Sequence, residues 1–283
     1  MFELVYRFDP ADRVCRPAPR NSDEARELLV RGNRDFVEMT STGLTDRKTR
    51  VVSFDPHDFG WGLAEGEVPL QAPFAAVLGC SDARVPTEMI FNQGCNELFV
   101  IRVAGNVLGN ECLGSLRFAV HAFPSSLKLL VVLAHDRCGA VTAAVEAYLD
   151  PRRYIAIATD PALRAIQDHI LVAVRIASLS MEQLYGIAVK TAPGFRAALI
   201  EAVVVINAAW SAYCLQQEFP TLAGGVVFGA YDLSSRYVRM PLSPPRHITE
   251  DEKGLFPPPE NEEAFHKLAE QLCTGPLIQT LLK

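Results

Sequence analysis

The clearest pattern in the sequence is a set of short, uninterrupted apolar runs separated by segments of helical period. Four such runs cover residues 74–79, 98–102, 129–134 and 226–231. Apolar strands without polar alternation are typical of parallel sheets that are covered on both faces. Helical segments lie between and after them, notably residues 195–217. The pattern predicts an α/β fold in one domain, with a central, mostly parallel β-sheet flanked by helices.

The N-terminal quarter of the chain predicts an arm, a helix and a loop. Residues 1–20 contain three prolines, which disfavour a helix, so we expect an arm there. Asn21 can cap the helix that follows, with Glu24 at the reciprocal capping position. Residues 40–73 are rich in Gly, Asp and Pro and are expected to be irregular or a lid-like loop. The apolar face of the helix is formed by Ala25, Leu28, Leu29 and Phe36.

The C-terminal part differs from the rest in composition. From Pro241 the chain is rich in proline, and it closes with a helical pattern over residues 262–273. We expect residues 241–283 to be an extension, either a strap over a neighbouring subunit or a loosely held tail.

Composition and charge narrow the class of protein. The chain has 283 residues, of which 49% are hydrophobic, and a formal net charge of −6, which gives no reason to expect nucleic-acid or anionic-membrane binding. The start lacks the apolar run of a signal peptide. The most apolar stretch, 197–215, is interrupted by Glu201, Asn207 and Tyr213, so we predict no membrane span. The seven cysteines show no disulfide spacing, and we expect a cytoplasmic protein.

Candidate chemistry follows two of the predicted strands directly. Cys80 ends the first apolar run, and His135 and Cys138 follow the third. Ligands of open parallel sheets bind beyond the carboxyl ends of the strands, so these side chains should meet there. A Cys₂His set suits zinc, and three protein ligands are typical of a catalytic site that leaves the fourth position to water.

Each part of this pattern also has an ordinary explanation. A cysteine at a strand end is usually a small buried apolar residue, and one H-x-x-C spacing is weak evidence of a metal site. Their occurrence together at two strand ends, with Asp82 and Arg84 beside the first, favours a zinc site. The remaining cysteines show no metal spacing and are expected to be free thiols: Cys15, Cys95, Cys112, Cys214 and Cys273.

Three motifs in one order resemble the β-class carbonic anhydrases. They are C-S-D-A-R-V-P at 80–86, R-V-A-G-N at 102–106 and H-D-R-C-G-A at 135–140. The resemblance covers about residues 21–240. It implies a catalytic domain over residues 21–240, which begins with an N-terminal helical arm. The N-terminal arm over residues 1–20 and the C-terminal extension over residues 241–283 lie outside the match.

The resemblance also implies an activity and its residues. Cys80, His135 and Cys138 would hold Zn²⁺, and zinc-bound hydroxide would attack CO₂ in a reversible hydration to bicarbonate and a proton. Asp82 would accept a hydrogen bond from that hydroxide, and Arg84 would hold Asp82 in an ion pair that keeps the site open. The enzyme would be a carbonic anhydrase, a zinc lyase.

The substrate pocket and the assembly are further implications of the resemblance. Gln71, Phe99 and Phe118 occupy the positions of the family's pocket residues, with Phe118 where plant-type members usually carry Tyr. The family builds its sites at a dimer interface, so we expect a homodimer or a higher homo-oligomer. The helix over 25–36 resembles the arm that lies across the partner.

Two other functions remain open on the sequence. The same zinc scaffold can hydrolyse CS₂ or COS. A non-catalytic, zinc-binding regulatory subunit is the other alternative, but it would predict damage to Asp82, Arg84 or a ligand, and all five residues are intact.

Overall fold

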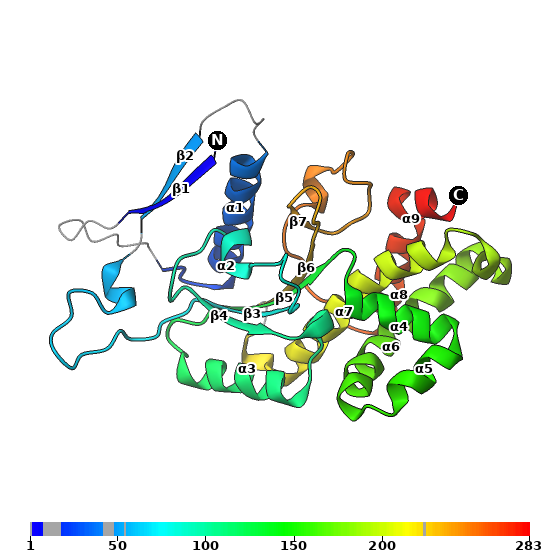
Figure 1. Cartoon of the computed structure of the whole chain (residues 1–283), viewed down its shortest axis with the longest axis horizontal. Coiled ribbons are helices and arrows are strands. Elements are labelled where there is room, and N and C mark those ends of the chain that lie inside the picture. The colour runs from blue at the N-terminus through cyan, green and yellow to red at the C-terminus, as the bar shows by residue number, and fades with distance from the viewer. Residues whose placement is uncertain (1, 8–17, 42–47, 54, 223–224) are drawn as a thin grey trace.

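A computed structural model of the protein shows a fold that is centred on one five-stranded sheet (Figure 1). The structure describes residues 2–7, 18–41, 48–53, 55–222 and 225–283. The strand order is β4-β3-β5-β6-β7, in which the first four strands are parallel and β7 is antiparallel to β6. The strands are β3 (Ala75–Gly79), β4 (Leu98–Arg102), β5 (Leu129–His135), β6 (Val226–Tyr231) and β7 (Val238–Arg239).

The continuous apolar runs form strands because both faces of the sheet are covered. All residues of β3, β5 and β6 are buried. Along β5, alternate side chains enter two separate cores: Leu130 and Val132 pack on one face, and Leu129 and Val131 on the other. The predicted α/β class with a mostly parallel sheet is therefore confirmed.

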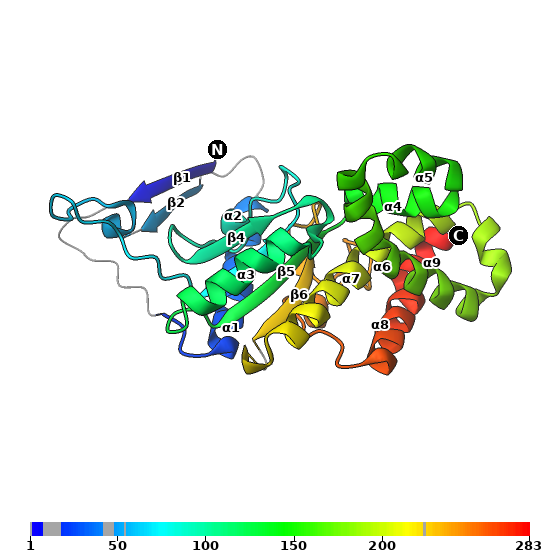
Figure 2. The same cartoon turned by 90° about the horizontal axis from the view of Figure 1, so that it is seen from below.

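Helices cover both faces of the sheet. On one face lie α1 (Ser22–Thr40) and α2 (Thr87–Ile90), and on the other lie α3 (Asn110–Ala122) and α7 (Phe195–Glu218) (Figures 1 and 2). By length and composition, α7 is the one described helix that could cross a membrane. However, 78% of its apolar window is buried, as expected for the central helix of a packed core.

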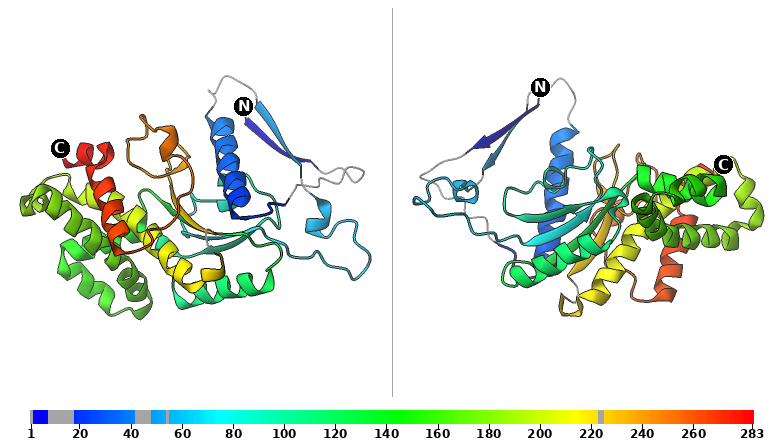
Figure 3. Two further views of the ribbon diagram at one scale, coloured as in Figure 1. Left: turned by 180° about the vertical axis from the view of Figure 1, so that it is seen from behind. Right: turned by 60° about the horizontal axis from the view of Figure 1, so that its bottom comes forward.

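Further helices form a group beyond the β6 side of the sheet (Figure 3). The C-terminal helix α8 begins at Glu262, as the sequence predicted, and contacts α6 and α7, while α9 contacts α7. The end of the extension is thus packed on helices of its own chain. The members of this group are α4 (Gly139–Leu149), α5 (Pro151–Ala158), α6 (Pro161–Tyr185), α8 (Glu262–Thr274) and α9 (Pro276–Leu282).

A small second sheet lies outside this architecture. It pairs β1 (Phe2–Arg7) in parallel with β2 (Lys48–Ser53), beside α1 in Figure 1. The expectation that residues 40–73 are irregular is wrong for β2 and for the short 3-10 helix Pro56–Phe59. Of the expected N-terminal arm, residue 1 and residues 8–17, with Cys15, lie outside the described residues, as do 42–47 and 54 of the expected loop.

The predicted cap of α1 is present, with one change. The Asn21 side chain accepts from the backbone N–H of Glu24 at 2.9 Å. The Glu24 carboxylate bonds the backbone N–H of Arg20 at 2.9 Å, one residue before the cap. The buried side of α1 packs on its own sheet, since Ala25 and Leu29 share a core with residues of β3 and β5. Gly32 lies against the end of α2, where a Cβ would meet the carbonyl oxygen of Phe91.

Candidate metal centre

The register of the sheet brings the predicted ligands together. In the pairing of β3 with β5, Gly79 lies opposite Leu133, so Cys80 and His135 leave the sheet at the same edge. The donor atoms of Cys80, His135 and Cys138 all lie within 4.8 Å of one another, and all three residues are buried. The structure thus confirms that these three residues form one cluster.

The distances within the cluster fit a zinc ion. Sγ of Cys80 lies 3.9 Å from Sγ of Cys138. Two sulfurs that bind one tetrahedral zinc at about 2.3 Å each are separated by about 3.8 Å. The donor set is soft and borderline, which is the chemistry that zinc prefers. No fourth Cys, His, Asp or Glu of the described residues joins the group, as expected where one position is kept for a substrate or water.

The imidazole of His135 is oriented for metal binding. Its Nδ1 lies 2.8 Å from the backbone oxygen of Asp136, which fixes Nδ1–H as the donor and leaves the lone pair on Nε2. Nε2 is buried and has no hydrogen-bond partner in the part of the chain that the structure describes. An orphaned acceptor in a buried position is the state that a metal ion would satisfy.

The thiols of the cluster differ in their acidity. The hydrogen bond between the two sulfurs is the chief cause that lowers the pKa of Cys80 to about 4. That hydrogen bond, with burial, raises the pKa of Cys138. The backbone N–H of Gly105 also points at Sγ of Cys80, at 3.4 Å. The metal-free cluster therefore holds one thiolate and one thiol, and metal binding has one thiol proton to displace.

The predicted pair of Asp82 and Arg84 is present and bidentate. Nε of Arg84 lies 2.9 Å from Oδ1 of Asp82, and Nη2 lies 2.6 Å from Oδ2. These bonds hold the pKa of the Asp82 carboxyl well below its usual range. Oδ2 of Asp82 also lies 3.8 Å from Nε2 of His135, so the ion pair borders the metal cluster. The catalytic roles of both residues stay predictions.

Arg102 braces the loop that carries Cys80 and Asp82. Its Nε donates to the backbone oxygen of Cys80 at 2.9 Å, and its Nη2 donates to the backbone oxygen of Asp82. The sequence placed Arg102 in a family-like motif, and the structure shows what its side chain holds.

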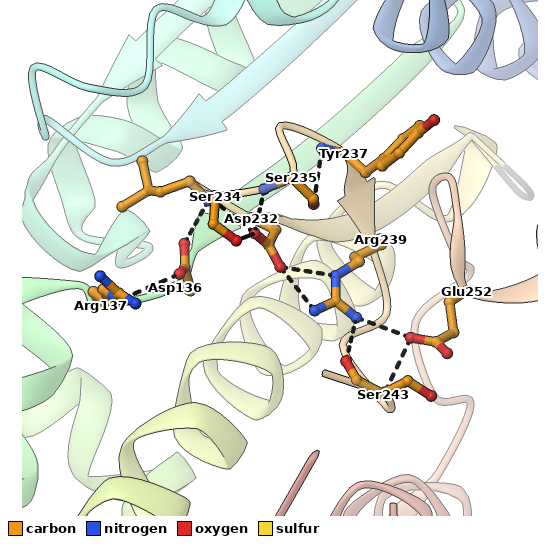
Figure 4. Close-up of polar contacts among 10 residues, drawn as sticks. Asp136, Arg137, Asp232, Ser234, Ser235, Tyr237, Arg239, Ser243 and Glu252 are labelled. Carbon is orange, nitrogen blue, oxygen red and sulfur yellow. Dashed lines mark hydrogen bonds and ion pairs between the residues drawn. The ribbon is translucent and has the colours of Figure 1, made fainter. Parts of the chain in front are cut away.

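A polar network that the sequence did not reveal supports the second ligand loop (Figure 4). Asp136, between the two ligands of that loop, accepts from the backbone N–H of Leu233 at 2.7 Å. Nearby, Arg239 is buried between two carboxylates: its Nη2 lies 2.7 Å from Oδ2 of Asp232, and its Nη1 lies 2.9 Å from Oε2 of Glu252. The only sequence signal was a set of charged residues placed next to buried strands.

The three predicted pocket residues do not join the metal cluster within one chain. Gln71 is exposed and precedes β3, whose five residues span about 17 Å before Cys80 follows at the other end. Phe99 pairs with Ala76, near the start of β3. The rings of Phe99 and Phe118 lie 6.4 Å apart, and Phe118 is 58% exposed. Their role in a substrate pocket stays a prediction.

Comparison with known proteins covers the part of the chain that holds this cluster. Residues 75–184 match a family model described as carbonic anhydrase. Carbonic anhydrase 2 of Mycobacterium tuberculosis is 47% identical over 130 residues, which are 46% of this chain and 56% of the relative. A carbonic anhydrase of Mycolicibacterium smegmatis is 42% identical over 106 residues, 37% of this chain and 50% of the relative. The matched segment thus spans about half the length of these curated relatives.

Solved structures also align with the chain, at lower identity. The β-carbonic anhydrase CafA of the fungal pathogen Aspergillus fumigatus aligns with a TM-score of 0.45 and 20% identity, covering 73% of this chain and 84% of the other. The β-carbonic anhydrase CcaA aligns with a TM-score of 0.45 and 20% identity, covering 60% and 74%.

Proposed function

Because residues 75–184 are similar to the carbonic anhydrase family, as the motifs predicted, we propose that this protein is a zinc enzyme that interconverts CO₂ and bicarbonate. The observation that carries the proposal is the buried cluster of Cys80, His135 and Cys138, whose donor atoms lie within 4.8 Å of one another. Bound zinc would supply the Lewis acidity that makes water nucleophilic near neutral pH.

The residues around the cluster suit this chemistry. Asp82 is ionised at neutral pH, and Arg84 holds its pKa below the ordinary carboxyl value, so Asp82 can accept a hydrogen bond from the nucleophile and orient it. Arg84 holds both carboxylate oxygens in hydrogen bonds beside the metal ligands, so that neither oxygen is free to become a further ligand. Arg102 fixes the backbone that carries Asp82, so the acceptor stays in place.

The direct test is stopped-flow CO₂ hydration by protein of known zinc content. Cys80→Ala should lose zinc and hydration together, since it removes one of three ligands. Cys112→Ala is the matched control, because Cys112 is also buried but lies outside the cluster, and it should keep both. Stoichiometric zinc without hydration would contradict the proposal, and hydrolysis of CS₂ or COS by that protein would support the alternative zinc hydrolase.

We also propose that two copies of the chain assemble, with each copy completing the substrate pocket of the other. Gln71 is exposed and lies at the amino end of β3, away from the cluster in its own chain. Beside it, Val68 is 77% exposed and Leu70 is 86% exposed, so two large apolar side chains next to Gln71 lie uncovered within one chain. A second copy is the occupant that would cover them.

Sedimentation analysis tests this assembly. Leu70→Asp should shift the protein toward the monomer and lower hydration without loss of zinc. Leu163→Asp, on an exposed position of α6, is the control and should leave the assembly unchanged. A monomeric but fully active wild type would contradict the shared pocket.

The compartment that fits these thiols is the cytoplasm. The six cysteines that the structure describes are all unpaired, as expected in a reducing environment. Fractionation of the source cells with an antibody against the protein tests this proposal, and recovery outside the cytoplasmic fraction would contradict it.

A further inference from the structure

One buried polar side chain of α7 has no role in the proposed chemistry so far. Asn207 is 1% exposed and lies in α7, a long and largely buried apolar helix, between Ile206 and Ala208, which are buried as well. Burying an amide in such a place costs free energy unless the amide is hydrogen-bonded. The hydrogen bond that the Asn207 side chain makes therefore indicates why an amide is buried at this position.

That contact leads to the metal cluster in two steps. Nδ2 of Asn207 donates to the backbone oxygen of Gly105 at 2.8 Å. The backbone N–H of Gly105 in turn points at Sγ of Cys80, at 3.4 Å. Gly105 thus lies between Asn207 and the metal ligand Cys80. Its carbonyl accepts from the Asn207 side chain, and its N–H points at the Cys80 sulfur.

The turn that carries Gly105 is fixed from other directions too. Gly105 has φ +67°, a left-handed conformation that favours glycine, and a Cβ there would lie 2.8 Å from Cδ1 of Ile170. Ser211, one helical turn after Asn207, places its Oγ 3.5 Å from the backbone oxygen of Asn106. The turn is therefore held at the Cα of Gly105, at the Asn106 carbonyl and at the Gly105 carbonyl, and Asn207 makes the last of these contacts.

We propose that Asn207 is a positioning residue of the metal centre, which orients the Gly105 N–H toward the Cys80 sulfur. This inference rests on the proposed metal site, and it means that α7 helps to position a ligand of that site. An N–H group directed at a ligand thiolate withdraws electron density from sulfur and holds the ligand in place, as outer hydrogen bonds do at metal sites.

Cobalt substitution measures this effect on the ligand itself. In Asn207→Leu the Gly105 carbonyl loses its hydrogen-bond donor. We then expect the Gly105 N–H to turn away from the Cys80 sulfur, which leaves the thiolate more electron-rich. The sulfur-to-cobalt charge-transfer band should move to longer wavelength, and zinc affinity should fall by about 10-fold or more. Ile206→Val is the control, because it weakens the packing of the same helix without touching the turn, and its band should not move.

The measurements separate failure of this inference from failure of the proposed function. An unchanged band and unchanged zinc affinity in folded Asn207→Leu would overturn the role of Asn207. In case that variant does not fold, wild-type protein loaded with ¹¹³Cd provides a second measurement. A scalar coupling between ¹¹³Cd and the Gly105 amide proton is expected, and its absence would overturn the inference while metal content and hydration stay intact. Loss of the proposed function would instead appear as wild-type protein without bound metal or hydration.

Discussion

Oδ2 of Asp82 lies 3.8 Å from Nε2 of His135, the ring nitrogen that is oriented for metal binding. The carboxylate could reach the metal position by a rotation of its own side chain. Instead, both of its oxygens are bonded to Arg84. Under the proposed function, we therefore expect the ion pair to determine whether Asp82 serves as an acceptor beside the metal or competes for the metal.

Substitution of Arg84 tests this arrangement. In Arg84→Ala the carboxylate is released, so we expect CO₂ hydration at neutral pH to fall by about 10-fold or more while zinc remains bound. Stopped-flow hydration beside zinc analysis provides the measurement. The chain offers a close control in Arg152→Ala, because Arg152 makes the same two-residue, bidentate pair with Asp150 outside the site, at 3.0 and 3.2 Å. Equal losses in both variants would contradict a specific role of Arg84.

The same variant gives a prediction for stability against pH. Because Arg84 lowers the folded-state pKa of Asp82, the stability that the pair contributes is present above the ordinary carboxyl pKa and is lost as the pH falls through the lower, folded value. The difference in unfolding free energy between wild type and Arg84→Ala should be constant above about pH 5 and shrink below about pH 4. Urea unfolding over this range would show it. A difference that grows on acidification would have the wrong sign.

Zinc affinity should depend on pH through one thiol. Cys80 has a pKa of about 4 in the metal-free cluster and is already a thiolate at neutral pH, whereas the pKa of Cys138 is raised and its proton must be displaced. Above about pH 8, the apparent zinc affinity should rise by about 10-fold per pH unit, one proton per zinc. Competition with a chelator at several pH values measures the slope. A flat profile would mean that neither thiol is protonated. A slope of two would mean that a second ligand, either Cys80 or His135, whose pKa is raised, also has a proton to lose.

The sequence predicted the parts of the fold that depend on local pattern. β4 and β6 have the predicted bounds because each is a short apolar run, although only β6 is buried along its whole length and β4, at the edge of the sheet, is partly exposed. β1 and β2 were not predicted, since their parallel pairing joins segments about 40 residues apart and neither segment has a strong apolar run. The metal cluster could be predicted because its three residues follow strand ends directly.

Other contacts of the site leave no mark in the sequence. Asp136 bonds the backbone of Leu233, and Asn207 bonds the backbone of Gly105, so the partner of each is a main-chain group that every residue carries. Such contacts depend on how distant segments pack and not on residue type. The position of Gln71, away from the cluster of its own chain, likewise reflects the assembly that we propose and not a local pattern.

The buried Arg239 should be important for stability. Its side chain is 1% exposed and lies between the carboxylates of Asp232 and Glu252, which are 5% and 4% exposed. Arg239→Met would leave two buried carboxylates without their cation, and we expect a loss of about 3–5 kcal/mol in unfolding free energy. Arg246→Met, at an exposed position of the same C-terminal segment, should change it by less than about 0.5 kcal/mol. Equal stabilities in urea unfolding would contradict the network in Figure 4.

The C-terminal extension should stabilise the helix that carries Asn207. Phe265 of α8 is 6% exposed, and its ring lies 5.2 Å from that of Tyr213 and 5.7 Å from that of Trp210, both on α7. Phe265→Ala removes this aromatic contact and leaves a cavity, so unfolding free energy should fall by about 3–5 kcal/mol. Lys267→Ala, on the exposed face of the same helix, is the control and should change it by less than about 0.5 kcal/mol. If Phe265→Ala were as stable as this control, α8 would be a loosely held tail, and the packing of α7 would not depend on it.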